Sequence, residues 1–406
     1  MERYYVGELG RVRLPDPYIA LIGLIVFLQF DGLYLLNADK LHTSDASLIL
    51  IAVLFVTVYA QYPGRVVYRY QWLILFSLVL AAVASYTAVI NYHQPFLMGF
   101  RALRSWYCTM LLYFPIAKLL KVRRLNVSQL INMINVFAAL YVSLGFLQFL
   151  LGSRMVFLHI GMGERYGSVR LWMDMTLPVL AYFIALSRIL KTEKSKIANY
   201  CIAISMLVFC VFVVKTRMII VTVVITTLIA ILLQRNTLKK ITTSIGFIAI
   251  VLLALSSQIG SDILDMAMGR ESTQGDTASI RQAGREFYLM HTVDSVPHLL
   301  FGNGFPNIDV AGVPEITGRT QGFAINDNGL YGLLYVYGLM FVVWIVVVHF
   351  RLLRDSFGMR LIGLPCFLIN GLLGMSTLYP YCYSDFSTVV CFPLVCAIIE
   401  NIRQQA

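Results

Sequence analysis

The chain has 406 residues, of which 59% are hydrophobic and 13% are charged. This composition excludes a water-soluble protein built around one core, and it predicts an all-α polytopic membrane protein. The formal net charge of +11 is explained by the basic loops that such proteins place on their cytoplasmic side and by contact with anionic lipids. The charge therefore indicates no nucleic-acid partner.

Apolar stretches long enough to cross the hydrocarbon layer recur along nearly the whole chain. Irregular backbone is excluded from lipid, so each stretch is expected to be a helix. We count about twelve transmembrane helices, the first nine within residues 1–258 and the last three within 328–406. The first is expected to be retained, because no small-residue cleavage site follows it. The expected spans are 17–36, 44–60, 70–90, 101–119, 131–151, 171–189, 197–214, 218–234, 241–258, 328–349, 361–379 and 386–400.

Lysine and arginine predict the orientation, because they concentrate in the short cytoplasmic loops of membrane proteins. Most of the 32 basic residues fall on one side of the membrane if the N-terminus is cytoplasmic, including the clusters at 118–124 and 188–196. Both termini are therefore expected in the cytoplasm.

The same topology places residues 259–327 outside, as one long extracytoplasmic loop that contains short helices. Ser279 and Gln282 have the spacing of a capping box, which predicts a helix over 279–293 that is broken before Pro297. The glycines of FGNGF, Gly302 and Gly304, predict a tight turn where the backbone approaches a ligand or another segment.

Several cations on the predicted outer side gain nothing from the insertion rule, and near the hydrocarbon edge they are costly unless paired or hydrated. Their expected use is as ligands of an anion. Arg281 and Arg285 are four residues apart and share one helix face, which suits a diphosphate. Salt bridges to the acidic residues of the loop are the alternative. The full set is Arg154, Arg165, Arg170, Lys215, Arg217, Arg270, Arg281, Arg285 and Arg319.

Four motifs in order resemble the O-antigen ligase and polymerase superfamily, membrane glycosyltransferases of the GT-C type. They are the Thr216-Arg217 turn, the helix SIRQAGREFYLMHTV, the turn PHLLFGNGF and the sequence INDNGLYGLLYVYGL. The resemblance is specific over about residues 210–340 and loose elsewhere. It implies transfer of a glycan from undecaprenyl pyrophosphate to an acceptor on the outer face of the bacterial inner membrane, without a metal or another cofactor.

Ligases of this superfamily typically open the helix after the loop with His-Asn, whereas the matching positions here are Asp327-Asn328. An Asp-Asn pair is more similar to Wzy-like polymerases, which join lipid-linked repeat units of O-antigen or exopolysaccharide to one another. Chain-length control in such a polymerase implies a co-polymerase partner. The alternatives are a ligase that transfers the glycan to lipid A-core and a lipid-linked glycan flippase or transporter.

Displacing pyrophosphate from an anomeric carbon with a sugar hydroxyl requires a base and cations that stabilise the departing charge. Asp327 is the expected base, and helix capping is the alternative role for the Asp-Asn pair. Arg217 and Arg281 are the expected catalytic cations. The cysteines and histidines show no metal-ligand spacing, so no metal site is expected. The expected substrate-binding residues are Arg165, Arg170, Lys215, Arg285, Asn328, Tyr288 and Tyr331, the two aromatic rings for sugar faces.

Overall fold

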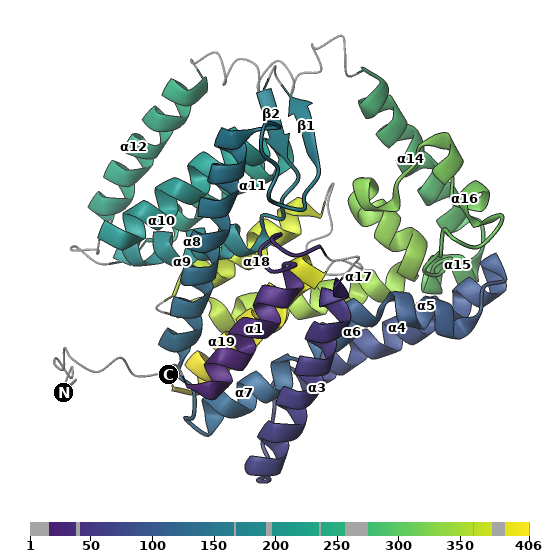
Figure 1. The fold of residues 1–406 in the computed structure, drawn as a ribbon, viewed down its shortest axis with the longest axis horizontal. Coiled ribbons are helices and arrows are strands. Elements are labelled where there is room, and N and C mark those ends of the chain that lie inside the picture. Colours follow the sequence, from purple (N-terminus) through teal and green to yellow (C-terminus); the bar gives the residue numbers. More distant parts are fainter. Residues whose placement is uncertain are drawn as a thin grey trace.

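The computed structural model describes residues 16–37, 41–165, 168–191, 197–234, 237–255, 275–359, 361–375 and 386–405. Most of this part of the chain is helical, as predicted (Figure 1). The first half contains α1 (Pro17–Gln29), α3 (Thr43–Gln61), α4 (Gln71–Tyr92), α5 (Phe96–Ala102), α6 (Arg104–Met110), α7 (Tyr113–Lys121), α8 (Val127–Leu151), the antiparallel strands β1 (Met162–Arg165) and β2 (Ser168–Leu171), and α9 (Thr176–Lys191). The second half contains α10 (Ile197–Val208), the π-helix η1 (Phe209–Val214), α11 (Arg217–Leu232), α12 (Thr237–Leu255), α14 (Gly275–Val293), α15 (Val296–Phe301), α16 (Val313–Ile316), the 3-10 turns η2 (Arg319–Gln321) and η3 (Ile325–Asn328), α17 (Gly329–Ser356), α18 (Gly363–Gly374) and α19 (Phe386–Gln405).

Helical segments fall on each of the predicted apolar stretches. Within the described part of the chain, five of them are long and apolar enough to cross a membrane: Thr43–Gln61, Gln71–Tyr92, Val127–Leu151, Ile197–Val214 and Ile325–Ser356. Large apolar side chains such as Val56, Leu150 and Ile245 are more than half exposed on these and neighbouring helices, which is the surface that lipid would cover. The structure therefore confirms an all-α architecture of the membrane type, and the larger number of spans stays a prediction.

The span predicted over 101–119 is not one continuous helix. It is divided among the end of α5, α6 and α7, with breaks at Leu103 and at 111–112, where hydrogen bonds of the 3-10 type occur. Leu103, Trp106 and Leu112 have no exposed surface. Irregular backbone at membrane depth is tolerated where protein surrounds it, and burial here explains how the break is accommodated.

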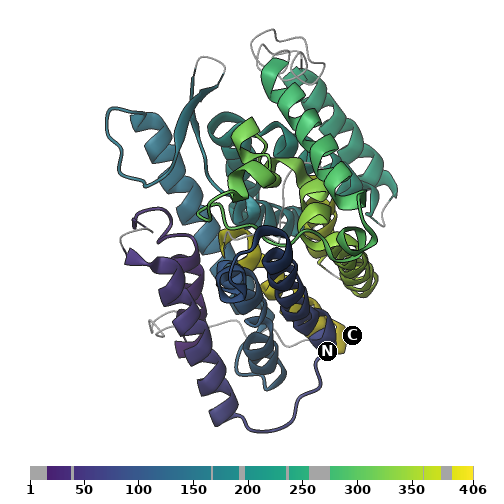
Figure 2. The same ribbon diagram turned by 90° about the vertical axis from the view of Figure 1, so that its right-hand side faces the viewer.

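Polar contacts between distant segments occur at both ends of the helical bundle. At one end, Arg124 pairs with Asp16 at 3.2 Å and Lys121 pairs with Glu400. The first and last described helices therefore place Asp16 and Glu400 at the same end of the bundle. At the other end, the Asn91 amide donates to the carbonyl of Asn303 at 3.1 Å. In both views the β1–β2 hairpin and α14 lie toward the top, and the C-terminus lies in the lower part (Figures 1 and 2).

The FGNGF turn packs backbone against backbone between α4 and a kink in α17. Gly338 interrupts α17 with a φ of 65°, and the Tyr335 and Val336 carbonyls just before it accept from Asn303 N at 2.6 Å and Gly304 N at 3.1 Å. A Cβ on Gly302 would lie 2.4 Å from the Val336 oxygen, and one on Gly304 would lie 2.5 Å from the Ala84 oxygen. The predicted close approach is thus confirmed, and it is made to other segments of this chain.

The predicted capping box at Ser279 is wrong, because α14 begins four residues earlier, at Gly275. The C-terminal limit at Val293 is as predicted. Pro297 occupies the first turn of the next helix, α15, where its missing N–H is not needed, and Ser295 caps that helix by accepting from His298 N at 3.3 Å. The first part of the long loop, residues 259–274, lies outside the described residues, as does Arg270.

Candidate functional site

The Arg281 guanidinium lies next to the Asp327 carboxylate at the point where the loop leads into α17. The Nη2 atom of Arg281 is 3.9 Å from Oδ2 of Asp327, and the two side chains are 45% and 50% exposed. Arg281 comes from α14, and Asp327 comes from η3, whose turn is closed by Asp327 N donating to the Ala324 carbonyl at 3.1 Å. An ion pair this open leaves both groups able to meet a ligand.

Arg285 lies one turn further along α14 and faces Tyr331, the third residue of α17. The guanidinium carbon is 5.9 Å from the centre of the Tyr331 ring, which is 37% exposed. Such a distance allows a cation–π attraction. Together, Arg281, Arg285, Asp327 and Tyr331 form a half-exposed group that we call the α14–α17 site.

Asn328 is 1% exposed, so its predicted contact with substrate does not fit the structure. Its side-chain amide donates to the Ala324 carbonyl at 2.8 Å and thereby helps to close the η3 turn. It is also the residue directly before α17, but its side chain makes no capping hydrogen bond there. The residue therefore stabilises the turn that carries Asp327.

Tyr288 has no exposed surface, which corrects its predicted role as a sugar platform. Its hydroxyl donates to the Thr317 carbonyl at 3.3 Å, and its ring packs 4.9 Å from that of Tyr335 in α17. The correction arises because Tyr288 lies on the face of α14 that packs against α17. This tyrosine fixes the base of the α14–α17 site.

The second predicted group of cations lies where β2, η1 and α11 meet. Arg170 donates to the Val214 carbonyl at 2.9 Å and to the Thr216 hydroxyl at 3.1 Å. Lys215 is 8% exposed, donates to the Val169 carbonyl at 3.1 Å and lies 5.7 Å from the centre of the Phe149 ring. Burial lowers the pKa of the Lys215 ammonium. Both side chains therefore hold the hairpin onto the η1–α11 turn.

Arg217 is the first residue of α11 and is half-buried, next to that turn. The backbone of Arg165 ends β1 and pairs with Ser168, whereas its side chain lies outside the described part of the structure. The contacts that hold this second group come from β2, η1 and α11, whereas those of the α14–α17 site come from α14, η3 and α17. The structure thus presents the predicted cations as two groups.

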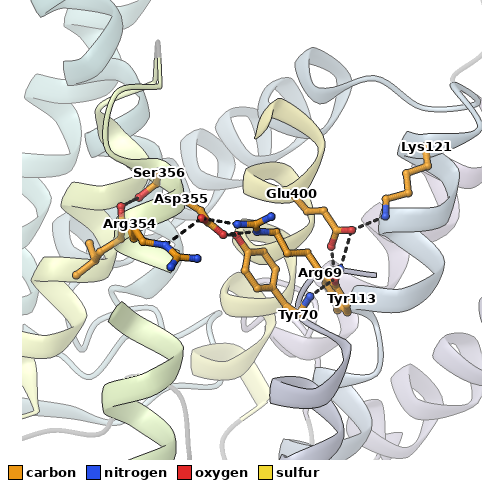
Figure 3. Close-up of polar contacts among 9 residues, drawn as sticks. Arg69, Tyr70, Tyr113, Lys121, Arg354, Asp355, Ser356 and Glu400 are labelled. Carbon is orange, nitrogen blue, oxygen red and sulfur yellow. Dashed lines mark hydrogen bonds and ion pairs between the residues drawn. The ribbon is translucent and has the colours of Figure 1, made fainter. Parts of the chain in front are cut away.

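A third cluster, at the end of the bundle predicted to be cytoplasmic, has no counterpart among the predicted site residues. Asp355 accepts from the Arg69 guanidinium at 2.5 and 2.9 Å and from the Tyr70 hydroxyl at 2.9 Å (Figure 3). The hydrogen bonds to Asp355 raise the pKa of Arg69. Glu400 is equally buried and binds Lys121 and the Tyr113 hydroxyl. The available sequence signal was weak: Glu400 is the last residue of the apolar stretch 386–400, and Asp355 follows the stretch 328–349 among basic residues. Both carboxylates are buried, and buried charges are retained where they are paired.

The described residues contain no group of three or more His, Cys, Asp or Glu side chains that could hold a metal ion. The α14–α17 site carries two guanidinium groups, those of Arg281 and Arg285. No family model matches the chain, and no curated protein matches it at a significant level.

Proposed function

We propose that this chain is a Wzy-like membrane glycosyltransferase that polymerises lipid-linked repeat units of O-antigen or exopolysaccharide. It would transfer the growing glycan from undecaprenyl pyrophosphate to the non-reducing end of another lipid-linked unit, on the outer face of the bacterial inner membrane. The observation that carries the proposal is the half-exposed pair of Arg281 and Asp327, 3.9 Å apart where the loop meets a helix long enough to cross the membrane.

In the proposed reaction, the acceptor hydroxyl oxygen attacks the anomeric carbon of the donor glycan. The bond from that carbon to the pyrophosphate oxygen breaks, and undecaprenyl pyrophosphate leaves with the electron pair. Asp327 takes the proton of the hydroxyl as general base. Its 50% exposure gives an acceptor sugar access to the carboxylate.

Arg281 and Arg285 bind the donor diphosphate and stabilise the negative charge that develops on it. They come from successive turns of α14, so their guanidinium groups can reach different oxygens of one diphosphate. Tyr331 offers a partly exposed ring beside Arg285 for the face of a sugar. The side chains supply the cationic charge, so the proposal includes no metal or other cofactor.

We assign Arg217 a second catalytic role in stabilising the diphosphate, with Arg165, Arg170 and Lys215 supporting donor binding at the β2–α11 junction. The support is the concentration of cations at one end of an apolar helix, where a lipid phosphate would lie. The hydrogen bonds of Arg170 and Lys215 indicate that these two act mainly by holding the junction in shape. A co-polymerase that controls chain length is the expected protein partner.

The test uses purified protein in liposomes, with a lipid-pyrophosphate-linked repeat unit as the sole substrate. Asp327→Asn is compared with Asp309→Asn, a matched change to an exposed loop carboxylate outside the site. We expect the parent and Asp309→Asn to form a ladder spaced by one repeat unit and Asp327→Asn to form none. A ladder of unchanged yield from Asp327→Asn would refute the assignment of the base.

The same assay separates the two rival functions. Transfer that begins only when a lipid A-core acceptor is added would identify a ligase. Absence of transfer to either acceptor, together with movement of the lipid-linked glycan across the bilayer, would identify a flippase.

A further inference from the structure

Helix α14 meets the η3 turn at Gly284, which lies between the two arginines of the α14–α17 site in sequence. Gly284 is buried. A Cβ added to it would lie 3.0 Å from Nδ2 and 3.3 Å from Oδ1 of Asn328. These distances are shorter than ordinary contacts between a carbon atom and a polar atom, so any larger residue would push the helix and the turn apart.

The Asn328 side chain has little freedom to move away from that contact. It is 1% exposed, and its amide nitrogen is held at 2.8 Å by the Ala324 carbonyl. Its Oδ1 is buried without a hydrogen-bond partner among the described residues. The hydrogen bond to Ala324 and the close packing against Gly284 therefore hold this side chain, and Oδ1 adds no further hydrogen bond to fix it.

This contact determines how close α14 comes to η3. Arg281 lies three residues before Gly284, hence on the same face of α14, and its partner Asp327 directly precedes Asn328. Arg285 directly follows Gly284, and Tyr331 lies three residues after Asn328. Both pairs of the α14–α17 site therefore flank one point of contact between a glycine and a rigid side chain.

We propose that Gly284, packed on Asn328, is a positioning residue that sets the register of α14 on η3 and holds Arg281 and Arg285 beside Asp327 and Tyr331. The inference rests on the proposed transferase function for its catalytic consequence, but its geometric part concerns the fold alone. In this proposal Asn328 is not a substrate ligand, and its side chain instead packs against Gly284. A small displacement of the arginines is expected to slow the reaction, since misplacement by about 1 Å can cost up to about 100-fold in rate.

The test uses Gly284→Ala, Asn328→Ala and the double variant that combines these two changes. Gly246→Ala is the control. Gly246 is a matched control because it is a helical glycine with no atom within 4 Å of an added Cβ. Two quantities are measured for each full-length protein in liposomes or detergent. They are the kcat and KM for ladder formation, and the midpoint of thermal unfolding, which needs no turnover.

We expect Gly284→Ala to lower kcat by about 10-fold or more with KM changed less than about twofold, and Gly246→Ala to leave both unchanged. We expect the double variant to have a higher kcat than Gly284→Ala, and its loss of unfolding midpoint to be smaller than the sum of the two single losses, because the crowded contact is removed. If Gly284→Ala does not fold, the double variant must be recovered in folded form.

A normal kcat for folded Gly284→Ala would overturn the positioning role, as would additive losses of midpoint in the double variant. A lowered midpoint with unchanged kcat would mean that the contact is merely structural. If the parent protein forms no ladder, the proposed function fails, and the unfolding midpoints still decide whether Gly284 and Asn328 are coupled.

Discussion

Glu400 offers the sharpest test of what holds the helices together at the end predicted to be cytoplasmic. Its side chain is 1% exposed, and it accepts from the Arg69 backbone N–H at 3.0 Å and from the Tyr113 hydroxyl while pairing with Lys121. Tyr113 itself accepts from the Tyr70 N–H at 3.1 Å. Glu400→Gln removes the negative charge and turns one acceptor into a donor that faces other donors.

The expected loss follows from these contacts. A buried donor without a partner costs about 1–3 kcal/mol, and breaking a buried ion pair costs about 3–5 kcal/mol. The Lys121 side chain is 12% exposed and also donates to the Val67 carbonyl, so in Glu400→Gln it keeps one hydrogen-bond partner and some contact with solvent. We therefore expect a loss of about 3 kcal/mol in the free energy of unfolding, at the lower end of that range.

For 406 residues, an unfolding entropy of about 2.1 cal/mol/K per residue converts this loss into a fall of about 3–4 °C in the unfolding midpoint. If a smaller part of the protein unfolds as one cooperative unit, its unfolding entropy is smaller and its midpoint falls further. The assay is thermal unfolding in detergent followed by tryptophan fluorescence, with Asp309→Asn as the control that exchanges an exposed carboxylate for its amide. A midpoint for Glu400→Gln equal to that of the control would refute the reasoning.

Three further changes probe other parts of the account. Gly302→Ala should cost more than about 3 kcal/mol in stability, because it combines a positive φ with overlap on the Val336 oxygen. The control Gly358→Ala, at a position with a φ of 90° and nothing within 4 Å, should cost only about 1–2 kcal/mol. Equal losses of stability in thermal unfolding would contradict this. Arg170→Ala should speed proteolysis in the β1–β2 hairpin by removing two hydrogen bonds to the η1–α11 turn, and an unchanged cleavage rate would show that other contacts hold the hairpin. Arg281→Lys should retain more transferase activity than Arg281→Ala because it keeps the positive charge. Equal rates for the two variants would show that the charge at this position does not contribute to catalysis.

The sequence predicted the helical architecture and the close packing of the loop because both depend on local signals. Apolar stretches of the right length predicted the helices. The glycines of FGNGF predicted a close backbone approach, which the structure shows between this turn and the kink of α17 at Gly338. The order of motifs assigned Arg281 and Asp327 to one site without specifying a contact, and the structure places their side chains 3.9 Å apart.

The features that sequence reasoning missed depend on contacts between distant parts of the chain. Arg69 and Asp355 are 286 residues apart, and no local pattern joins them. The burial of Tyr288 and Asn328 depends on how α14 packs against α17, which the periodicity of one helix does not specify. Gly284 did have a signal, because an isolated glycine costs about 1 kcal/mol inside a helix and is usually retained for packing.

The most direct test of the central claim is the stoichiometry of the reaction. Purified protein in liposomes is given the lipid-pyrophosphate-linked repeat unit without nucleotide or added metal, and both the glycan ladder and the released undecaprenyl pyrophosphate are quantified. The proposed mechanism predicts one lipid pyrophosphate released for each glycosidic bond formed, with both products lost in Asp327→Asn. Release of lipid pyrophosphate without a ladder, or no release from folded protein, would contradict it.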